Sequence, residues 1–145
     1  MKYGLLLCSN SLVNGTENNS SLFFTSVNQI NKGGPSAIHY LEHRSKFAVL
    51  NLKAGKLSIV LSDYTTAMKF FEHGISYLGG DCWTAEYKLS LGLYDAVVEA
   101  ASVLGKTESV TRYTNEVVNN AHSFDDRLHC KYLIIYPLCD SFVTY

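Results

Sequence analysis

Apolar residues recur at spacings of three and four in successive stretches of this chain, and that spacing constrains its fold more than any other feature. In "SDYTTAMKFFEHGISYLGGDCW", residues 62–83, one stripe is formed by Tyr64, Ala67, Met68, Phe71, Gly74, Ile75 and Leu78. Polar residues fall on the opposite face, which is the pattern of an amphipathic helix. Ser62 can cap its start, Asp63 suits the positive end of the helix dipole, and Gly79-Gly80 can end it. Phe70 and Tyr77 form a narrow seam beside the stripe, so this helix is expected to contact two neighbours.

The same pattern predicts helices before and after this one. Their expected ranges are about 22–32, 38–61, 82–104 and 107–121, followed by a last helix that opens at Ser123 and must end at Pro137. In the helix expected at 82–104, the stripe is Trp83, Tyr87, Leu91, Tyr94, Val97, Val98, Ala101 and Leu104. Asp81 and Thr107 can cap two helices, and Ser123 with Asp126 resembles a capping box. Since no stretch alternates with a period of two and the connections are short, we expect an all-α chain of antiparallel helical hairpins.

Two segments share a further plan, which indicates an internal repeat. Both "LNLKAGKLSIVLSDYTTAMKFFEHGISYL" and "YDAVVEAASVLGKTESVTRYTNEVVNNA" have a helix with small residues inside, Ala54-Gly55 and Ala100-Ala101, then a tight turn and a second helix. The second helix of the first segment carries Ala67, Phe71 and Gly74 inward. Small residues let helices approach closely, and the two turns are 43 residues apart, within the period range of helical solenoids.

The helix with Ala67, Phe71 and Gly74 after Ala54-Gly55 resembles a tetratricopeptide-type repeat, with Asn51 in place of the usual tryptophan. More widely, "NQINKGG", "LNLKAGK", "SDYTTAMKFFEHGISYLGGDCW" and "YKLSLGLYDAVVEAASVLGKTESVTRYTNEVV" are similar to the helical-repeat region that follows the predicted ATPase module of large multidomain signalling proteins. Those proteins often have a serine/threonine-kinase-like domain upstream, and many have a histidine kinase or cyclase domain downstream. The resemblance covers about residues 24–136 and implies a short tetratricopeptide-like α-solenoid, without catalytic residues or cofactors, that binds partners or regulates the neighbouring ATPase. The residues that carry the expected repeat are Ala54, Gly55, Ala67, Phe71, Gly74, Trp83, Tyr87, Tyr94 and Gly105.

The two ends of the chain depart from this pattern. Residues 1–21 combine a four-residue apolar patch with a Ser/Asn/Gly/Thr tract, and the patch is too short for a secretory signal. We expect a disordered polar tail at 1–21, a helical-repeat domain at 22–136 and a C-terminal tail at 137–145, in a cytoplasmic protein or a fragment of one. The open C-terminal end could form a homodimer through Tyr132, Leu133, Ile134 and Ile135.

Composition and motifs argue against several function classes. The net charge is −1 and lysines are scattered among acidic residues, which disfavours a nucleic-acid or membrane partner. No apolar run approaches the ~18 residues that a membrane span needs. The chain has no Gly-x-x-x-x-Gly-Lys-Ser/Thr loop and no His-Arg-Asp or Asp-Phe-Gly triplet, so ATPase or kinase activity is not expected. The four cysteines form no Cys-x-x-Cys pair and match no zinc template.

One stretch carries a sharper chemical alternative. His39, Glu42 and His43 match the His-x-x-Glu-His spacing of inverted zinc peptidases. On a helix the two histidines would share a face and could bind zinc, with Glu42 as the general base. The alternative function is therefore a small zinc-dependent hydrolase, although three fixed positions match easily by chance. A second group clusters in sequence without fitting a standard metal template: His122, His129 and Cys130.

Trp83, Tyr87 and Tyr94 allow two interpretations. They share one helix face and could line a groove for an aromatic ligand. Aromatic residues at helical spacing more often form a core, because packed hairpins consume them there. The sequence therefore favours a core role for these residues, and for the chain as a whole a non-catalytic scaffold for protein–protein or interdomain interaction.

Overall fold

The computed structural model describes residues 17–38, 40–128 and 130–132, and all regular structure in these ranges is helical. The helices are α2 (Glu17–Gly33), the 3-10 turn η1 (Pro35–Ala37), α3 (Leu41–Val60), α4 (Tyr64–Leu78), α5 (Cys82–Ala85), α6 (Tyr87–Val103) and α7 (Thr107–Asn120). Residues 124–128 and 130–132 are also helical. The expectation of an all-α chain is therefore confirmed for the part of the chain that is described.

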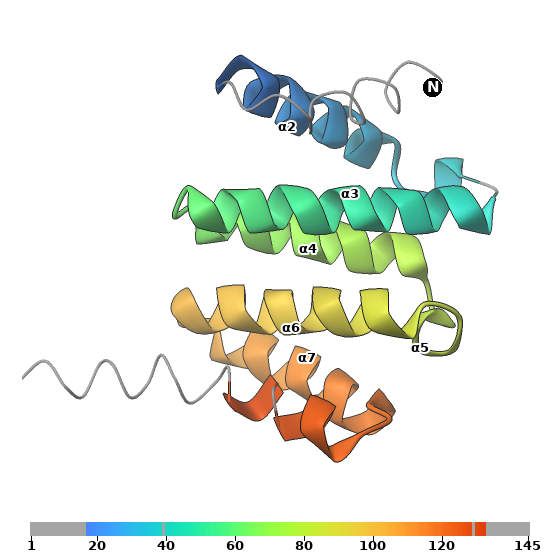
Figure 1. The fold of residues 1–145 in the computed structure, drawn as a ribbon, viewed down its shortest axis with the longest axis vertical. Helices are drawn as coiled ribbons and strands as arrows, with labels where there is room; N and C mark the ends of the chain where they lie inside the picture. The colour runs from blue at the N-terminus through green and yellow to red at the C-terminus, as the bar shows by residue number, and fades with distance from the viewer. Residues whose placement is uncertain (1–16, 39, 129, 133–145) are drawn as a thin grey trace, which may run out of the picture.

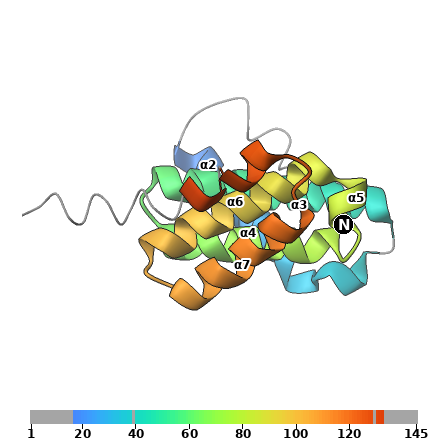
Figure 2. The same cartoon turned by 90° about the horizontal axis from the view of Figure 1, so that it is seen from below.

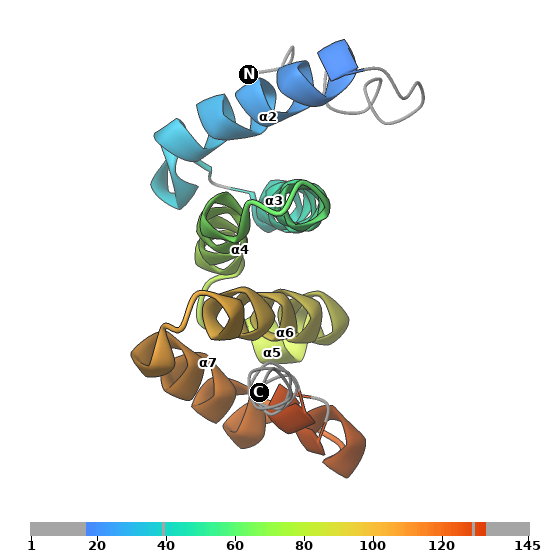
Figure 3. The ribbon, with the colours of Figure 1, turned by 90° about the vertical axis from the view of Figure 1, so that its left-hand side faces the viewer.

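The helices stack in chain order along the longest axis of the molecule (Figure 1). The main contacts join α3 to α4, α4 to α6 and α6 to α7, with a smaller contact between α2 and α3. Figure 3 looks along α3 and α4 and shows them as a side-by-side pair, with α2 and α7 at opposite ends of the stack. Figure 2, from below, shows α7 and the helical residues after it lying across α6. This sequential antiparallel packing agrees with the predicted hairpins.

Helix α4 occupies the middle of the stack, as its two apolar seams predicted. Its main stripe is buried except for Tyr64 and Ile75, which are partly buried, and the side seam reaches the α2 side of α3. Phe70 packs against Phe24, with ring centroids 5.8 Å apart. Tyr77 packs against Phe47 at 5.6 Å, and its hydroxyl donates a hydrogen bond of 3.0 Å to the carbonyl oxygen of Ile30. The expectation that α4 contacts more than one neighbour is confirmed.

Two glycines mark the closest helix approaches. A Cβ built on Gly55 would lie 2.6 Å from Cδ1 and 2.7 Å from Cζ of Phe71. A Cβ on Gly74 would lie 2.7 Å from Cδ2 of Leu93, in α6. Only a residue without a side chain leaves room for these neighbours, so the small positions of the sequence pattern do permit close packing.

A polar pair lies between α2 and α3. The side-chain amides of Asn31 and Asn51 donate to one another at 2.8 and 3.0 Å, and Asn51 also donates to the carbonyl oxygen of Phe47 at 2.9 Å. Asn51 is fully buried. Each amide satisfies the other, so the pair holds α2 in one register on α3.

Several predicted boundaries are wrong. Helix α2 begins at Glu17 rather than near residue 22, so residues 17–21 belong to a helix instead of a polar tail, and α3 begins at Leu41 rather than near 38. The helix expected at 82–104 is broken at Glu86, whose φ and ψ are −136° and 50°. Two serine side chains, one from α6 and one from α3, make hydrogen bonds at this break. Ser90 donates to the carbonyl oxygen of Cys82 at 2.9 Å, and Ser45 donates to the Glu86 carboxylate at 3.0 Å.

The predicted helix caps also differ in part. Asp63, and not Ser62, caps α4 by accepting from the Thr66 N–H at 3.0 Å, while Ser62 adopts a φ of 61° in the turn. Neither Asp81 nor Thr107 makes a side-chain cap bond, and Thr107 is the first residue of α7. Gly79 and Gly105 end their segments at φ of 75° and 67°, which glycine adopts without strain, and Ser123 accepts from the Asp126 N–H at 3.1 Å as a cap.

The predicted tails at 1–16 and 137–145 lie outside the described residues. Within the described residues, no helix has both the length and the apolar content that crossing a membrane requires.

Candidate functional site

A pocket of about 290 Å³ opens beside the α4–α5 turn, α5 and the middle of α6 and α7. These segments lie next to one another in the half of the stack that runs from α4 to α7 (Figure 1). Its lining residues are Gly79, Gly80, Cys82, Trp83, Tyr94, Arg112, Tyr113 and Glu116. Four segments therefore contribute to one concave site, which is a common form of ligand or partner site.

Aromatic rings form the wall of the pocket. The ring centroids of Trp83 and Tyr94 are 5.0 Å apart, and those of Tyr94 and Tyr113 are 6.0 Å apart in an edge-on arrangement. Trp83 and Tyr94 are each 8 % exposed, so the predicted core role is confirmed. The same two rings also line the pocket.

Helix α7 places a cation and an anion at the rim, one turn apart. The guanidinium of Arg112 lies 4.5 Å from the ring centroid of Tyr113 and donates to its hydroxyl at 2.6 Å. That hydroxyl donates in turn to Oε1 of Glu72 at 2.9 Å. Arg112 also lies 4.0 Å from the same Glu72 oxygen, and Glu116 lies four residues further along the same helix.

The tyrosines of the pocket are neutral phenols at physiological pH. Burial raises the pKa of Tyr94 to about 12. Burial, followed by the bond to the Glu72 carboxylate, raises the pKa of Tyr113. Both hydroxyls therefore serve as hydrogen-bonding groups rather than as bases or nucleophiles at neutral pH.

One polar group of the wall is left without a partner. The indole Nε1 of Trp83 is buried and makes no hydrogen bond to any described residue. A buried donor of this kind costs about 1–3 kcal/mol when it is left unsatisfied.

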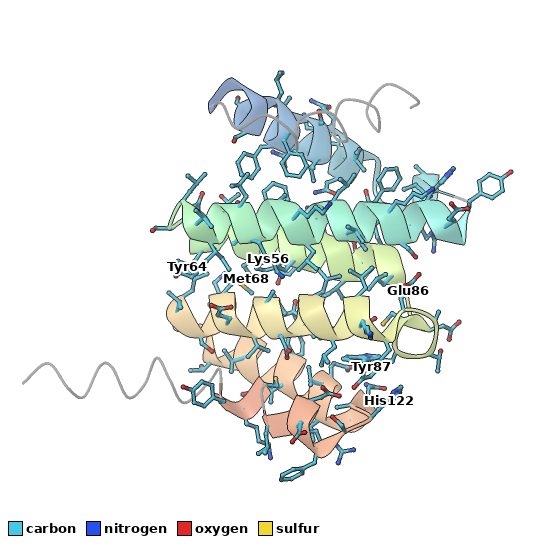
Figure 4. All side chains as sticks on the ribbon, in the orientation of Figure 1. Lys56, Tyr64, Met68, Glu86, Tyr87 and His122 are labelled. Atoms are coloured by element: carbon cyan, nitrogen blue, oxygen red, sulfur yellow. The ribbon has the colours of Figure 1, made fainter. Side chains whose placement is uncertain are left out.

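Tyr87 extends the aromatic array away from the pocket. Its ring stacks on His122 with centroids 3.9 Å apart and an interplanar angle of 8°, and Figure 4 shows the two side chains against each other. Its hydroxyl donates to Oδ2 of Asp126 at 2.7 Å and accepts from the His122 N–H at 2.9 Å. The bond from Tyr87 is the largest cause that lowers the pKa of Asp126. These contacts attach the segment after α7 to the start of α6.

Among the described residues, the sequence-based metal candidates do not come together in a site. His39 and His129 lie outside the described residues. Glu42 is exposed and pairs with Lys46 at 2.7 Å, and the bond to Lys46 lowers the pKa of Glu42. The ring of His43 instead meets that of Tyr40 edge-on, with centroids 5.7 Å apart. In the described part of the chain, no group of three or more His, Cys, Asp or Glu residues is placed to hold a metal ion.

Cys130, from the second group of metal candidates, is buried, and its thiol stays protonated at neutral pH. Burial raises the pKa of its thiol to about 11, and its sulfur contacts Oγ1 of Thr114 at 3.9 Å. A thiol held protonated at neutral pH is a poor metal ligand and a poor nucleophile. Its environment is that of a core residue.

A second, polar pocket of about 490 Å³ lies between α2 and α4. Its lining contains no carboxylate and consists of Thr25, Asn28, Gln29, Asn31, Lys32 and His73. Asn31 is already paired with Asn51, as described above. No sequence pattern indicates this pocket, because its residues lie on the polar side of α2 and only meet α4 after folding.

Apart from Gly105, which ends α6, the predicted repeat residues fall into two groups in the structure. Those of α3 and α4 lie at helix contacts, with Phe71 over Gly55 and with Gly74 against Leu93 of α6. Trp83, Tyr87 and Tyr94 form an aromatic cluster on α5 and α6, with 6.0 Å between the centroids of Trp83 and Tyr87. The sequence interpretation missed the contribution of the α7 rim and of the α4–α5 turn to the pocket. Their only sequence signals were the inward position of Tyr113 and the glycine pair after α4.

Comparison with known proteins identifies no family. No family model matches the chain, and neither the curated proteins nor the solved structures yield a match. The similarity to tetratricopeptide-type repeats therefore depends on the residues quoted from the sequence.

Proposed function

We propose that this chain is a non-catalytic helical-repeat scaffold that binds a partner protein or a neighbouring domain of a longer polypeptide. The observation that carries the proposal is the order of packing: the main contacts join successive helices of the stack, α3 to α4, α4 to α6 and α6 to α7. Helical solenoids are built in this way, and their extended surfaces and end faces are used for binding. On this proposal the two hairpins are units of a short tetratricopeptide-like α-solenoid.

Apolar side chains at both ends of the stack support an interaction role. Leu22 of α2 is 58 % exposed, and Phe124 and Leu128 after α7 are 71 % and 47 % exposed. Phe124 and Leu128 are four residues apart in a helical segment, so they share a face. A homodimer through this C-terminal face, or a further helix pair of the same polypeptide, would cover them. Leu133, Ile134 and Ile135, which we expected in that interface, lie outside the described residues.

The resemblance places such regions beside an ATPase module in cytoplasmic signalling proteins, and we infer the same setting for this chain. Extending the messenger RNA at both ends tests that setting. A transcript that encodes an ATPase module upstream supports a regulatory segment. A transcript that ends at Tyr145 without such a module contradicts it.

Partner capture tests the scaffold itself. The wild-type chain and a Leu22→Glu/Phe124→Glu variant would be immobilised at equal density and exposed to an extract of cells that express the chain. Both substitutions lie at exposed positions, so the variant should keep its helical circular dichroism and its unfolding midpoint. We expect a defined protein to be retained by the wild type and lost from the variant. Equal recovery from both would contradict binding through the ends of the stack.

A further inference from the structure

We propose that the pocket formed by Gly79, Trp83, Tyr94 and Tyr113 receives one aromatic side chain of the partner protein, while Arg112 and Glu116 bind the main chain on either side of it. This inference rests on the proposed scaffold function and names the chemistry of its partner. The occupant is therefore a phenylalanine-like or tyrosine-like side chain in an exposed peptide segment.

The size and wall of the pocket favour a single ring. At about 290 Å³ it lies at the lower limit of the range for drug-sized ligands, which is the scale of one side chain rather than of a nucleotide or a larger cofactor. The rings of Trp83, Tyr94 and Tyr113 already make tilted and edge-on contacts with each other. An added ring extends this array by the same geometries, which aromatic pairs prefer. Buried aromatic anchors of this kind dominate the energy of many protein interfaces.

The rim matches the dipole of a peptide backbone. Arg112 offers donors and Glu116 offers acceptors, one turn apart on α7, so a backbone C=O can pair with the first and a backbone N–H with the second. Arg112 lies over the Tyr113 ring, is bonded to the Tyr113 hydroxyl and lies 4.0 Å from Oε1 of Glu72. A cation that already faces a carboxylate suits a neutral backbone carbonyl better than a free anion.

The opening of the pocket is bordered by residues without side chains. Gly79 and Gly80 line it, and a Cβ at either position would meet no atom within 4 Å. Among the described residues, the α4–α5 turn therefore leaves the entrance uncovered.

The experiment uses Trp83 as a built-in reporter, because it is the single tryptophan of the chain. The probe is N-acetyl-phenylalanine amide, which carries one aromatic ring between two peptide groups. N-acetyl-alanine amide, which has the same backbone without the ring, is the matched control. Binding is followed by Trp83 fluorescence and by the one indole N–H signal in a ¹⁵N–¹H correlation spectrum. We expect a saturable shift of both signals with the phenylalanine probe and none with the alanine probe.

Two glycine variants distinguish a loss of probe binding at the pocket from a loss of the fold. Gly80→Phe adds a ring at the pocket entrance, and it should weaken the binding of the phenylalanine probe by about tenfold or more. Gly33→Phe introduces the same side chain at an exposed position at the end of α2, and it should leave the affinity unchanged. Equal unfolding midpoints of the two variants show that the fold is retained.

Absence of a saturable shift, equal affinity for both probes, or equal weakening by both variants would each overturn the inference. The proposed scaffold function is tested separately, at the two ends of the stack by Leu22→Glu/Phe124→Glu. Failure of the probe to bind with normal partner capture therefore refutes the aromatic pocket alone. Failure of partner capture with normal probe binding refutes the scaffold proposal.

Discussion

The substitution Gly55→Ala tests how closely α3 and α4 approach. Inside a helix, alanine is favoured over glycine by about 0.5–1 kcal/mol, so an isolated helix would gain stability. In this fold the added Cβ would lie 2.6 Å from Cδ1 of Phe71, well inside the ~3.5–4.0 Å of an ordinary carbon contact. Phe71 is fully buried, so its ring cannot turn into solvent to make room.

The magnitude follows from these two opposed effects. Overpacking a core by one methyl or methylene group costs about 1–3 kcal/mol. Subtracting the helix preference of about 0.5–1 kcal/mol leaves an expected net loss of about 0–2.5 kcal/mol, or up to several degrees in Tm. Gly92→Ala is the matched control, because Gly92 lies inside α6 and its Cβ would meet Cδ2 of Leu52 at 3.9 Å, an ordinary contact. Gly92→Ala should therefore stabilise the chain by about 0.5–1 kcal/mol.

Urea unfolding followed by far-ultraviolet circular dichroism measures both changes. Repeating Gly55→Ala in a Phe71→Leu background completes a double-mutant cycle, because the smaller side chain removes the ring atoms that the new methyl group meets. In that background the cost of Gly55→Ala should vanish. The reasoning is refuted if Gly55→Ala is as stabilising as Gly92→Ala, or if its cost is unchanged by Phe71→Leu.

Four further predictions concern separate parts of the structure. Asn51→Ala should cost about 1–3 kcal/mol because it leaves the Asn31 amide unpaired, and Asn31→Ala/Asn51→Ala should cost less than the sum of the single variants in urea unfolding. The bond from Thr66 holds the pKa of Asp63 below its ordinary 3.8, so the stabilisation is present above that value and is lost as the pH falls through the lower folded-state pKa. Asp63→Asn keeps an uncharged cap, and the difference between its unfolding midpoint and that of the wild type should shrink below about pH 4; a constant difference would contradict this. Sedimentation equilibrium should show concentration-dependent dimers for the wild type and a weaker association for Phe124→Glu, whereas identical curves would exclude this face as the dimer interface. Metal analysis of protein purified without chelator should find no stoichiometric zinc, and stoichiometric zinc that is lost in His43→Ala would revive the hydrolase alternative.

The positions of most helices could be predicted because their apolar periods are local properties of the sequence. Phe70 and Tyr77, seven residues apart, indicated a second contact face on α4, and the structure places both against the α2 side of the stack. The close helix contacts at Gly55 and Gly74 could also be predicted, since only small residues fit where helices approach most closely. In each of these cases the residues that decide the structure lie on one helix.

The break at Glu86 could not be predicted, because no glycine or proline marks it. It depends on Ser45, which lies 41 residues earlier in the chain, and on Ser90, whose hydroxyl binds the Cys82 carbonyl oxygen. The pocket likewise depends on residues that are far apart in the sequence. Trp83 and Tyr94 were recognised as aromatic positions, but the rim that completes the pocket comes from Arg112 on another helix, and no local pattern pairs these segments.

The neighbour-to-neighbour packing of this stack also has a consequence for folding kinetics. Helices that contact mainly their sequence neighbours give a low contact order, and chains of low contact order fold rapidly. Synthesis proceeds from the N-terminus, so α3 and α4 can close into a hairpin before α6 and α7 have been made. During elongation each new helix can pack on a helix that has already been made, which limits the apolar surface open to aggregation on the ribosome.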